Sequence, residues 1–331
     1  MRTAIILSGL AALLPVLALL HLCGGARPLP PATVWAALTD YDAANFLHLV
    51  VIKQRLSRLA VALGVGGCLA AAGYLLQKVL RNDLVSPSTL GVNSGATAFA
   101  VAAIHFGGLS GSALFWPSLA GAAAGLLLAG VAAELLGRGS RDPLNLVLGG
   151  AMSATLFSAA SAFILSLDPD AFGNILSWLV GDIGIFDYQT LQTLWPAALA
   201  ALLVLGLLTR RLDLLALGED QAASLGADPR LMQRIAIAGS VVLAVIAVTV
   251  AGPIGFVGLV VPHIARLWLG DAGLAPLGGA LLLGAALLTT ADLLARTLLA
   301  PRLLNVGTVM ALFGGMAFLA LVVITLRRRS T

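Results

Sequence analysis

Long runs without a charged residue follow one another along almost the whole chain, at residues 3–22, 59–77, 84–133, 143–167, 190–209, 235–265, 272–291 and 306–326. A helix of about 20 apolar residues crosses the hydrocarbon core of a bilayer, where every backbone group must find its hydrogen bond within the protein. The pattern therefore predicts an integral membrane protein built of helices.

Two of these runs are too long for a single crossing. The run 84–133 is interrupted at residues 105–111 by the sequence His-Phe-Gly-Gly-Leu-Ser-Gly. The run 235–265 contains the pair Gly252-Pro253, and a proline inside a helix removes a hydrogen bond and clashes with the preceding turn. Splitting both runs predicts ten transmembrane helices, with residues 1–331 forming one all-α transmembrane domain.

The composition supports the same class of protein. Of 331 residues, 60% are apolar and 10% are charged, whereas ordinary soluble domains are about 25% charged. Such a chain cannot cover a water-facing surface, which excludes a soluble enzyme, a nucleic-acid-binding domain and a disordered protein. The run 3–22 lacks small residues before Cys23, so we expect it to be retained as the first span rather than removed as a signal peptide.

The basic residues indicate an orientation for these helices. With the N-terminus inside the cell, thirteen Lys and Arg residues lie inside and six lie outside, as the positive-inside rule requires. The six outside residues are Arg27, Lys53, Arg55, Arg58, Arg296 and Arg302. Both termini are then cytoplasmic, and the net charge of +4 requires no nucleic-acid partner.

Two polar connections between the spans are longer than simple turns. Residues 27–53, outside, begin with prolines and end in a stretch typical of a short amphipathic helix. Residues 210–234, inside, carry apolar residues at helical spacing, with Gly218 and Gly226 where short helices end. From the pattern alone, this inside segment is either a connector on the membrane surface or a docking element for a soluble partner.

Little in the sequence indicates catalysis or metal binding. Cys23 and Cys68 have no partners at metal-ligand spacing, and His263 is more typical of a structural histidine. The chain contains no Gly-x-x-x-x-Gly-Lys-Ser/Thr phosphate loop, so any ATP would be bound by another polypeptide. We therefore expect no enzyme activity, no metal site and no cofactor in this chain.

Three stretches resemble one known family. The first runs from Arg55-Leu-Ser-Arg58 through Arg81-Asn-Asp-Leu-Val-Ser-Pro87 to Leu90-Gly-Val-Asn-Ser-Gly-Ala96. The second is Leu214-Leu-Ala-Leu-Gly-Glu-Asp-Gln-Ala-Ala-Ser-Leu-Gly226. The third is Gly252-Pro-Ile-Gly-Phe-Val-Gly-Leu-Val-Val-Pro-His-Ile-Ala-Arg266, followed by Ala291-Asp-Leu-Leu-Ala-Arg296. In order and spacing, they resemble the permease subunits of bacterial ABC importers for iron-siderophores, haem and vitamin B12 (the type II importers).

The resemblance covers essentially the whole chain and implies a ten-helix permease in the bacterial inner membrane. It implies a second permease subunit, identical or paralogous, two cytoplasmic ATPase subunits that bind ATP and Mg, and a periplasmic substrate-binding protein. The chain departs from the family at Asp83, where Pro is usual. It also departs at residues 303–307 and 314–318, where Glu-Leu-Pro-x-Gly and Gly-Ala-Pro-x-Phe are usual.

The resemblance further implies two sets of contact residues. Arg55, Arg58 and Arg296 match arginines that receive glutamates of the binding protein, and their alternative role is to anchor lipid headgroups. The family's coupling helices, which dock into the ATPase, correspond to residues of about 213–229. The matching contact residues are Leu214, Leu217, Gly218, Glu219, Ala222, Leu225 and Gly226.

A gate and a translocation path are implied in the same way. Asn82 and Leu84 match positions that narrow the cytoplasmic exit, although an ordinary turn would use similar residues. The fifth span lines the path in the family, which makes its hydroxyls candidates, although such hydroxyls often bond to the backbone instead. The candidates are Ser153, Thr155, Ser158 and Ser161. Gly121-x-x-x-Gly125, by contrast, indicates close helix packing.

The cargo is the least specific of these expectations. The motif between Arg81 and Gly95 is most similar to the ferric-siderophore branch, and haem or cobalamin remains an alternative. A second class, the transporter driven by protons or sodium, normally buries a carboxylate in mid-span. Here Glu134 and Asp292 lie towards the ends of their spans, which favours the ATP-driven importer.

Overall fold

The computed structural model describes residues 2–137, 143–167, 173–184, 188–215 and 228–330, and this part of the chain contains helices and no strand. The long helices are α1 (Arg2–Cys23), α4 (Ser57–Leu80), α5 (Val92–Gly107), α6 (Phe115–Gly137), α7 (Pro143–Leu167), α9 (Tyr188–Leu215), α11 (Pro229–Ala251), α12 (Val257–Leu269), α13 (Ala275–Thr297) and α14 (Val306–Ser330). Between them lie the short helices α2 (Pro31–Thr39), α3 (Phe46–Leu49) and α8 (Gly173–Leu179), the π-helical η1 (Val50–Leu56) and the 3-10 turn η2 (Gly111–Leu114).

Each of the ten predicted spans contains one of the long helices. Within the described residues, seven helical stretches are long and apolar enough to cross a membrane. The others are shorter: α12, the stretch Val306–Leu319 of α14, and α5 with 16 residues. The predicted all-α membrane architecture is therefore confirmed.

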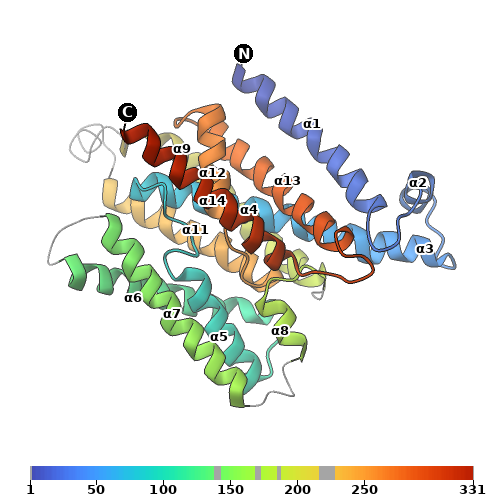
Figure 1. Ribbon diagram of the computed structural model, residues 1–331, viewed down its shortest axis with the longest axis horizontal. Helices are drawn as coiled ribbons and strands as arrows, with labels where there is room; N and C mark the ends of the chain where they lie inside the picture. Colours follow the sequence, from blue (N-terminus) through green and yellow to red (C-terminus); the bar gives the residue numbers. More distant parts are fainter. Residues whose placement is uncertain (1, 138–142, 168–172, 185–187, 216–227, 331) are drawn as a thin grey trace.

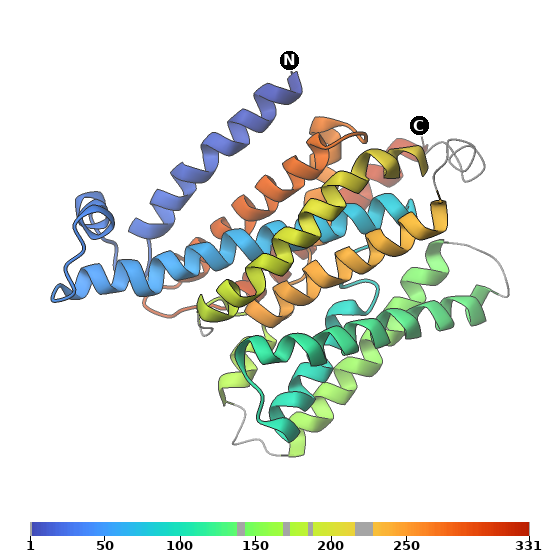
Figure 2. The same ribbon diagram turned by 180° about the vertical axis from the view of Figure 1, so that it is seen from behind.

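Helix α4 occupies the centre of the bundle. It packs against α11, α12 and α13, and most of its side chains from Leu59 to Val79 are buried. Helix α1 lies beside α13 at one edge, while α5, α6 and α7 form a group at the opposite edge (Figures 1 and 2). Residues on α4 therefore connect the two ends of the bundle through its core.

The predicted break at Gly252-Pro253 is confirmed. Helix α11 ends at Ala251, Gly252 has a φ of +74°, and the helix resumes at Val257. A side chain at Gly252 would overlap the Trp178 carbonyl oxygen, so the break is also where the last turn of α8 packs closely. The second predicted break is confirmed at Gly107, where α5 ends.

The segment before α4 is more helical than its pattern indicates. Helix α2 begins at Pro31, because proline is favourable in the first turn of a helix. A second helical stretch begins after Asn45, whose side chain accepts a hydrogen bond from the Leu47 N–H (3.0 Å), and continues from Phe46 to Leu80. Arg55 and Arg58 do not end this helix, because their charges find partners inside the protein.

The glycine pattern of α6 produces the close packing that it predicts. A Cβ atom on Gly95 of α5 would overlap the Gly121 carbonyl oxygen, and one on Gly125 would overlap the Gly91 carbonyl oxygen. The backbones of α5 and α6 are therefore in direct contact, which only glycine permits at these positions.

Candidate functional site

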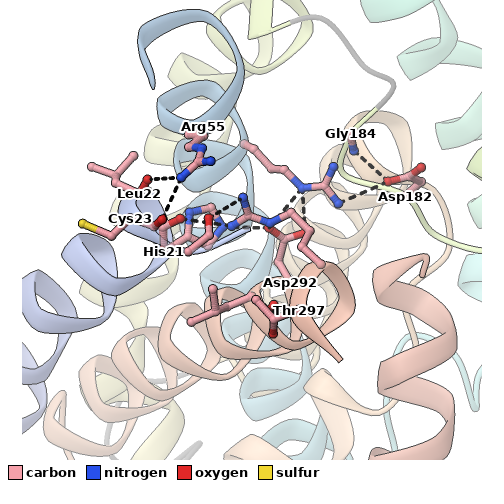
Figure 3. Close-up of polar contacts among 12 residues, drawn as sticks. His21, Leu22, Cys23, Arg55, Asp182, Gly184, Asp292 and Thr297 are labelled. Carbon is pink, nitrogen blue, oxygen red and sulfur yellow. Dashed lines mark hydrogen bonds and ion pairs between the residues drawn. The ribbon is translucent and has the colours of Figure 1, made fainter. Parts of the chain in front are cut away.

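Arg55 joins the end of α1 to the helix that leads into α4. Its Nη1 donates to the carbonyl oxygens of Leu22 (2.6 Å) and Cys23 (2.9 Å), and its Nη2 donates to that of Arg27 (2.6 Å). The last carbonyls of a helix have no partner within the helix, so a buried guanidinium satisfies them well. Arg55 is 8% exposed and acts as a C-terminal cap for α1 (Figure 3).

Asp292 on α13 is the centre of a buried ion cluster. The Arg58 Nε donates to both of its carboxylate oxygens, at 2.8 and 3.0 Å. The Arg296 Nε lies 3.2 Å from Oδ2, and the His21 Nε2 lies 2.7 Å from the same oxygen. Asp292 is 0% exposed, and three helices, α1, α4 and α13, meet on its carboxylate (Figure 3).

The segment after α8 adds a second carboxylate to this cluster. Asp182 Oδ1 lies 3.6 Å from the Arg58 Nη2 and accepts a hydrogen bond from the Gly184 N–H at 2.8 Å (Figure 3). Arg58 is therefore shared between α13 and the chain that follows α8. We call the group formed by His21, Arg55, Arg58, Asp182, Asp292 and Arg296 the Asp292 cluster.

A cavity of about 650 Å³ lies beside the Asp292 cluster. Its lining includes five basic residues, Arg27, Lys53, Arg55, Arg58 and Arg296, and among its described lining residues none is acidic. Cations gathered in a concave surface raise the local concentration of anions, and guanidinium groups match carboxylates in shape. The cavity is suited to receive a carboxylate or another anionic group.

The three arginines predicted for docking are thus brought together in one cluster. Arg55 and Arg296 are buried, and Arg296 also donates to the carbonyl oxygens of His21 (3.2 Å) and Gly24 (3.4 Å). The Arg58 side chain is 15% exposed and forms part of the cavity lining. Arg27 and Lys53 are the exposed cations of the same cavity.

The two predicted exit residues lie in the loop after α4. Arg81 ends α4 in the left-handed region (φ +49°), and the Asn82 side chain accepts a hydrogen bond from the Leu84 N–H (3.0 Å). This is the local turn geometry that asparagine favours. Leu84 is 39% exposed, so its side chain is not part of the core, and its role as a gate remains a prediction.

Most of the predicted coupling residues lie outside the described residues. Leu214 belongs to the last turn of α9, while Leu217, Gly218, Glu219, Ala222, Leu225 and Gly226 fall within the undescribed range 216–227. The described residues resume at Asp228, whose side chain caps α11 by accepting hydrogen bonds from the N–H groups of Arg230 (3.0 Å) and Leu231 (3.2 Å).

The four hydroxyl residues of α7 divide into two pairs. Ser153 and Ser161 are buried and donate to the carbonyl oxygens of Gly125 and Phe157, both at 2.9 Å. Thr155 and Ser158 are exposed, and Thr155 bonds to its own helix at Ala151 (2.9 Å). Only this second pair is accessible to a path along the outer face of α7.

Sequence reasoning missed the residues that hold the arginines. His21 and Asp292 are 271 positions apart, and no local spacing joins them. The available signal was the pair Asp292 and Arg296, four residues apart on one helix, which commonly form an ion pair. Within the described residues, no group of three or more His, Cys, Asp or Glu side chains is placed to hold a metal ion.

A bundle of apolar helices with a buried ion cluster and a cation-lined cavity at one end defines a polytopic membrane protein. Comparison with known sequences gives its family: the chain belongs to the FecCD transport family, which it matches over residues 13–324. This confirms the resemblance carried by the three motifs, and it identifies a transport permease.

Several permeases are similar to this chain over most of their length. The chain is 35% identical to the "Ferric enterobactin transport system permease protein FepD" of Escherichia coli (strain K12) over 268 residues, 80% of this chain and 79% of the relative. It is 34% identical to the "Fe(3+) dicitrate transport system permease protein FecD" of the same strain over 322 residues, 92% of this chain and 94% of the relative. With the "Probable siderophore transport system permease protein YfiZ" of Bacillus subtilis (strain 168) the identity is 37% over 282 residues, 85% and 84% of the two chains.

A solved structure is similar as well. Its title is "An inward-facing conformation of a putative metal-chelate type ABC transporter", and the two chains superpose with a TM-score of 0.80 at 29% identity. The match covers 97% of this chain and 99% of the other. The fold described above is therefore that of an ABC transporter permease.

Proposed function

We propose that this chain is the permease subunit of an ATP-binding-cassette importer that moves a ferric-siderophore from the periplasm to the cytoplasm. The observation that carries the proposal is the match, over 80% and 92% of this chain, to permeases named for ferric enterobactin and ferric dicitrate transport. Haem and cobalamin are the alternative cargoes. ATP hydrolysis belongs to separate ATPase subunits, and this chain binds no cofactor of its own.

The proposed complex contains two permease subunits, two cytoplasmic ATPase subunits and a periplasmic binding protein. It lies in the bacterial inner membrane, with both termini of this chain in the cytoplasm, because this orientation leaves most basic residues inside. The Asp292 cluster then faces the periplasm. The ATPase would contact the segment of about 213–229, through Leu214, Leu217, Gly218, Glu219, Ala222, Leu225 and Gly226.

Arg55, Arg58 and Arg296 are proposed to present positive charge to acidic side chains of the binding protein. The cation-lined cavity supports this role, because its described lining contains five basic residues and no acidic one. Arg58 stands in that lining while it also pairs with Asp292 and Asp182, so an incoming carboxylate would share its guanidinium group with them. At the other end, Asn82 and Leu84 would narrow the exit. Thr155 and Ser158 are the best placed of the α7 hydroxyls to line the path, since both are exposed.

A transporter driven by protons or sodium is the second candidate, because Asp292 is a buried carboxylate. Its oxygens, however, already meet Arg58, Arg296 and His21, which leaves little capacity for a transported cation. The ATP-driven importer is therefore favoured.

Uptake into proteoliposomes tests the proposal. The permease is reconstituted with its partner ATPase and binding protein, and labelled ferric enterobactin, ferric citrate, haem and cobalamin are offered separately. We expect uptake of a ferric chelate that requires both partners and hydrolysable ATP. Uptake that follows a proton or sodium gradient without ATP would contradict the proposal. Uptake of haem or cobalamin alone would show that this compound, and not a ferric-siderophore, is the cargo.

Removing the charge of Arg58 should slow docking. We expect Arg58→Gln to lower the association rate of the loaded binding protein by up to about fivefold, since a partly exposed ion pair contributes about 0–1 kcal/mol. The difference should shrink as added salt screens the pair over about 8–10 Å. The measurement is the association rate at the reconstituted complex across a range of ionic strength.

The matched control for this prediction is Arg302→Gln. Arg302 is exposed and lies outside the cavity lining, and its backbone N–H donates to the Leu299 carbonyl oxygen (2.8 Å). The same association rate and salt dependence for both variants would show that docking does not use the Asp292 cluster.

A further inference from the structure

A second group of charged residues lies at the other end of α4 from the Asp292 cluster. It comprises Lys78, Asp83, Asp213, Arg266 and Asp271, and we call it the Lys78 cluster. These residues come from the last turn of α4, the loop after it, the end of α9, the last turn of α12 and the turn before α13. They surround a cavity of about 360 Å³. None of the contact, exit or path residues named above belongs to this cluster.

The ion pair between Lys78 and Asp213 is the more buried part of the cluster. The Lys78 side chain is 11% exposed, and its Nζ also donates to the Tyr74 hydroxyl at 3.2 Å. The second carboxylate oxygen of Asp213 accepts a hydrogen bond from the Gly273 N–H at 2.8 Å. Asp213 therefore fixes the end of α9 both to α4 and to the turn before α13.

Arg266 carries the more exposed part of the cluster. Its Nη2 lies 2.8 Å from Asp83 Oδ1, and its Nε lies 3.6 Å from Asp271 Oδ1. The Asp83 side chain is 66% exposed, and a pair with so much solvent contributes about 0–1 kcal/mol. The loop after α4 is thus held to α12 by a contact that can open and close at little cost.

The positions of Asp83 and Asp213 in the sequence connect the cluster to two segments with proposed roles. Asp213 is the first residue of the segment of about 213–229 that is proposed to dock on the ATPase. Asp83 stands between Asn82 and Leu84, the proposed exit residues, and it occupies the position where the family usually has proline. Proline has no charge to offer Arg266, so this ion pair is a feature of this chain rather than of the motif.

We propose that the Lys78 cluster is the joint that transmits movement of the end of α9 to the loop carrying Asn82 and Leu84, with the pair of Asp83 and Arg266 as its releasable latch. The inference rests on the proposed function, from which it takes the coupling and exit roles. The buried pair of Lys78 and Asp213 moves as one unit with the end of α9. The turn at Asp271 then carries the displacement to Arg266, where the latch opens. All five are positioning residues, remote from the chelate.

A charge exchange at the latch tests this inference. The complete complex is reconstituted with its ATPase and binding protein, and the chelate imported per ATP hydrolysed is measured for Arg266→Asp, for Asp83→Arg and for the double variant. We expect each single variant to lower this ratio about three- to fivefold while ATP hydrolysis continues. A change of this size is within the free energy that a partly exposed ion pair contributes. The double variant should recover the ratio, because it restores the pair in reverse. Glu134→Arg, at an exposed carboxylate of α6, is the matched control.

Two results would overturn the joint alone: single variants that import normally, or a double variant that stays as low as the single ones. A wild-type complex that assembles but imports no chelate would overturn the proposed function, and the joint with it. Thermal unfolding of each purified complex identifies variants that fail to fold. For those, Asp83→Asn removes the charge at nearly constant size, and a normal ratio in this variant would also overturn the latch.

Discussion

Replacing Asp292 by asparagine is expected to destabilise the protein by about 3–5 kcal/mol, because removing one partner of a buried ion pair leaves uncompensated charge inside the protein. The Asp292 carboxylate is 0% exposed and lies against two arginines, Arg58 and Arg296. Asparagine keeps the size of the side chain but carries no charge. The guanidinium groups would then repel each other in a site with little water, and α1, α4 and α13 would lose their common contact.

The measurement is the thermal unfolding temperature of the purified permease, with Asp182→Asn as the matched control. That control makes the same chemical change in the same cluster, but Asp182 is 14% exposed and lies 3.6 Å from Arg58, so we expect a much smaller effect. Equal unfolding temperatures for the two variants would show that Asp292 is not the centre of the cluster. A variant Asp292→Glu, which keeps the charge, is expected to retain more of the stability than Asp292→Asn.

The helices of this fold could be predicted from the sequence for a simple physical reason. A backbone in hydrocarbon must satisfy its own hydrogen bonds, so each crossing requires a long apolar helix, and charged residues mark its ends. This rule located all ten long helices. The break at Gly252-Pro253 could be predicted too, because proline cannot continue a helix without strain.

The same rule failed where a charge is satisfied inside the protein. Arg55 and Arg58 set the predicted start of the second span, yet the helix extends back to Phe46. Their head groups meet the carbonyl of Leu22 and the carboxylate of Asp292, which the sequence could not reveal. Helix α8 was missed because its seven residues are too few to show a periodic pattern.

The candidate site could be predicted only in part. The candidates Arg55, Arg58 and Arg296 follow from their motifs and from their predicted place on the outer side of the membrane, where basic residues are disfavoured. Their partners were not, because His21 and Asp182 are brought to Asp292 by the packing of helices that are distant in the sequence. The Lys78 cluster was missed for the same reason, although the departure at Asp83 marked the position where Arg266 finds a partner.

The close contact between α4 and α12 leads to the second large effect. We expect Gly73→Ala to destabilise the permease by about 3 kcal/mol or more, at or above the upper end of the usual cost of overpacking a core. A Cβ atom on Gly73 would overlap the carbonyl oxygen of Gly258, which is backbone and cannot rotate away. The two helices would have to separate, and the bonds from Gln77 Nε2 to the carbonyl oxygens of Gly258 (3.4 Å) and Leu259 (3.2 Å) would weaken with them.

Gly67→Ala is the control, since it makes the same substitution on the same helix. Its Cβ would lie 3.5 Å from Leu281 Cδ2, an ordinary contact, and alanine is favoured over glycine in a helix by up to about 1 kcal/mol. We therefore expect this control to unfold at or above the wild-type temperature, and Gly73→Ala to unfold well below it and to accumulate poorly in the membrane. If the two variants unfold at the same temperature, the contact of α4 with α12 is looser than the structure indicates. In that case, α12 could slide against α4, and the Lys78 cluster would be a weaker joint than proposed.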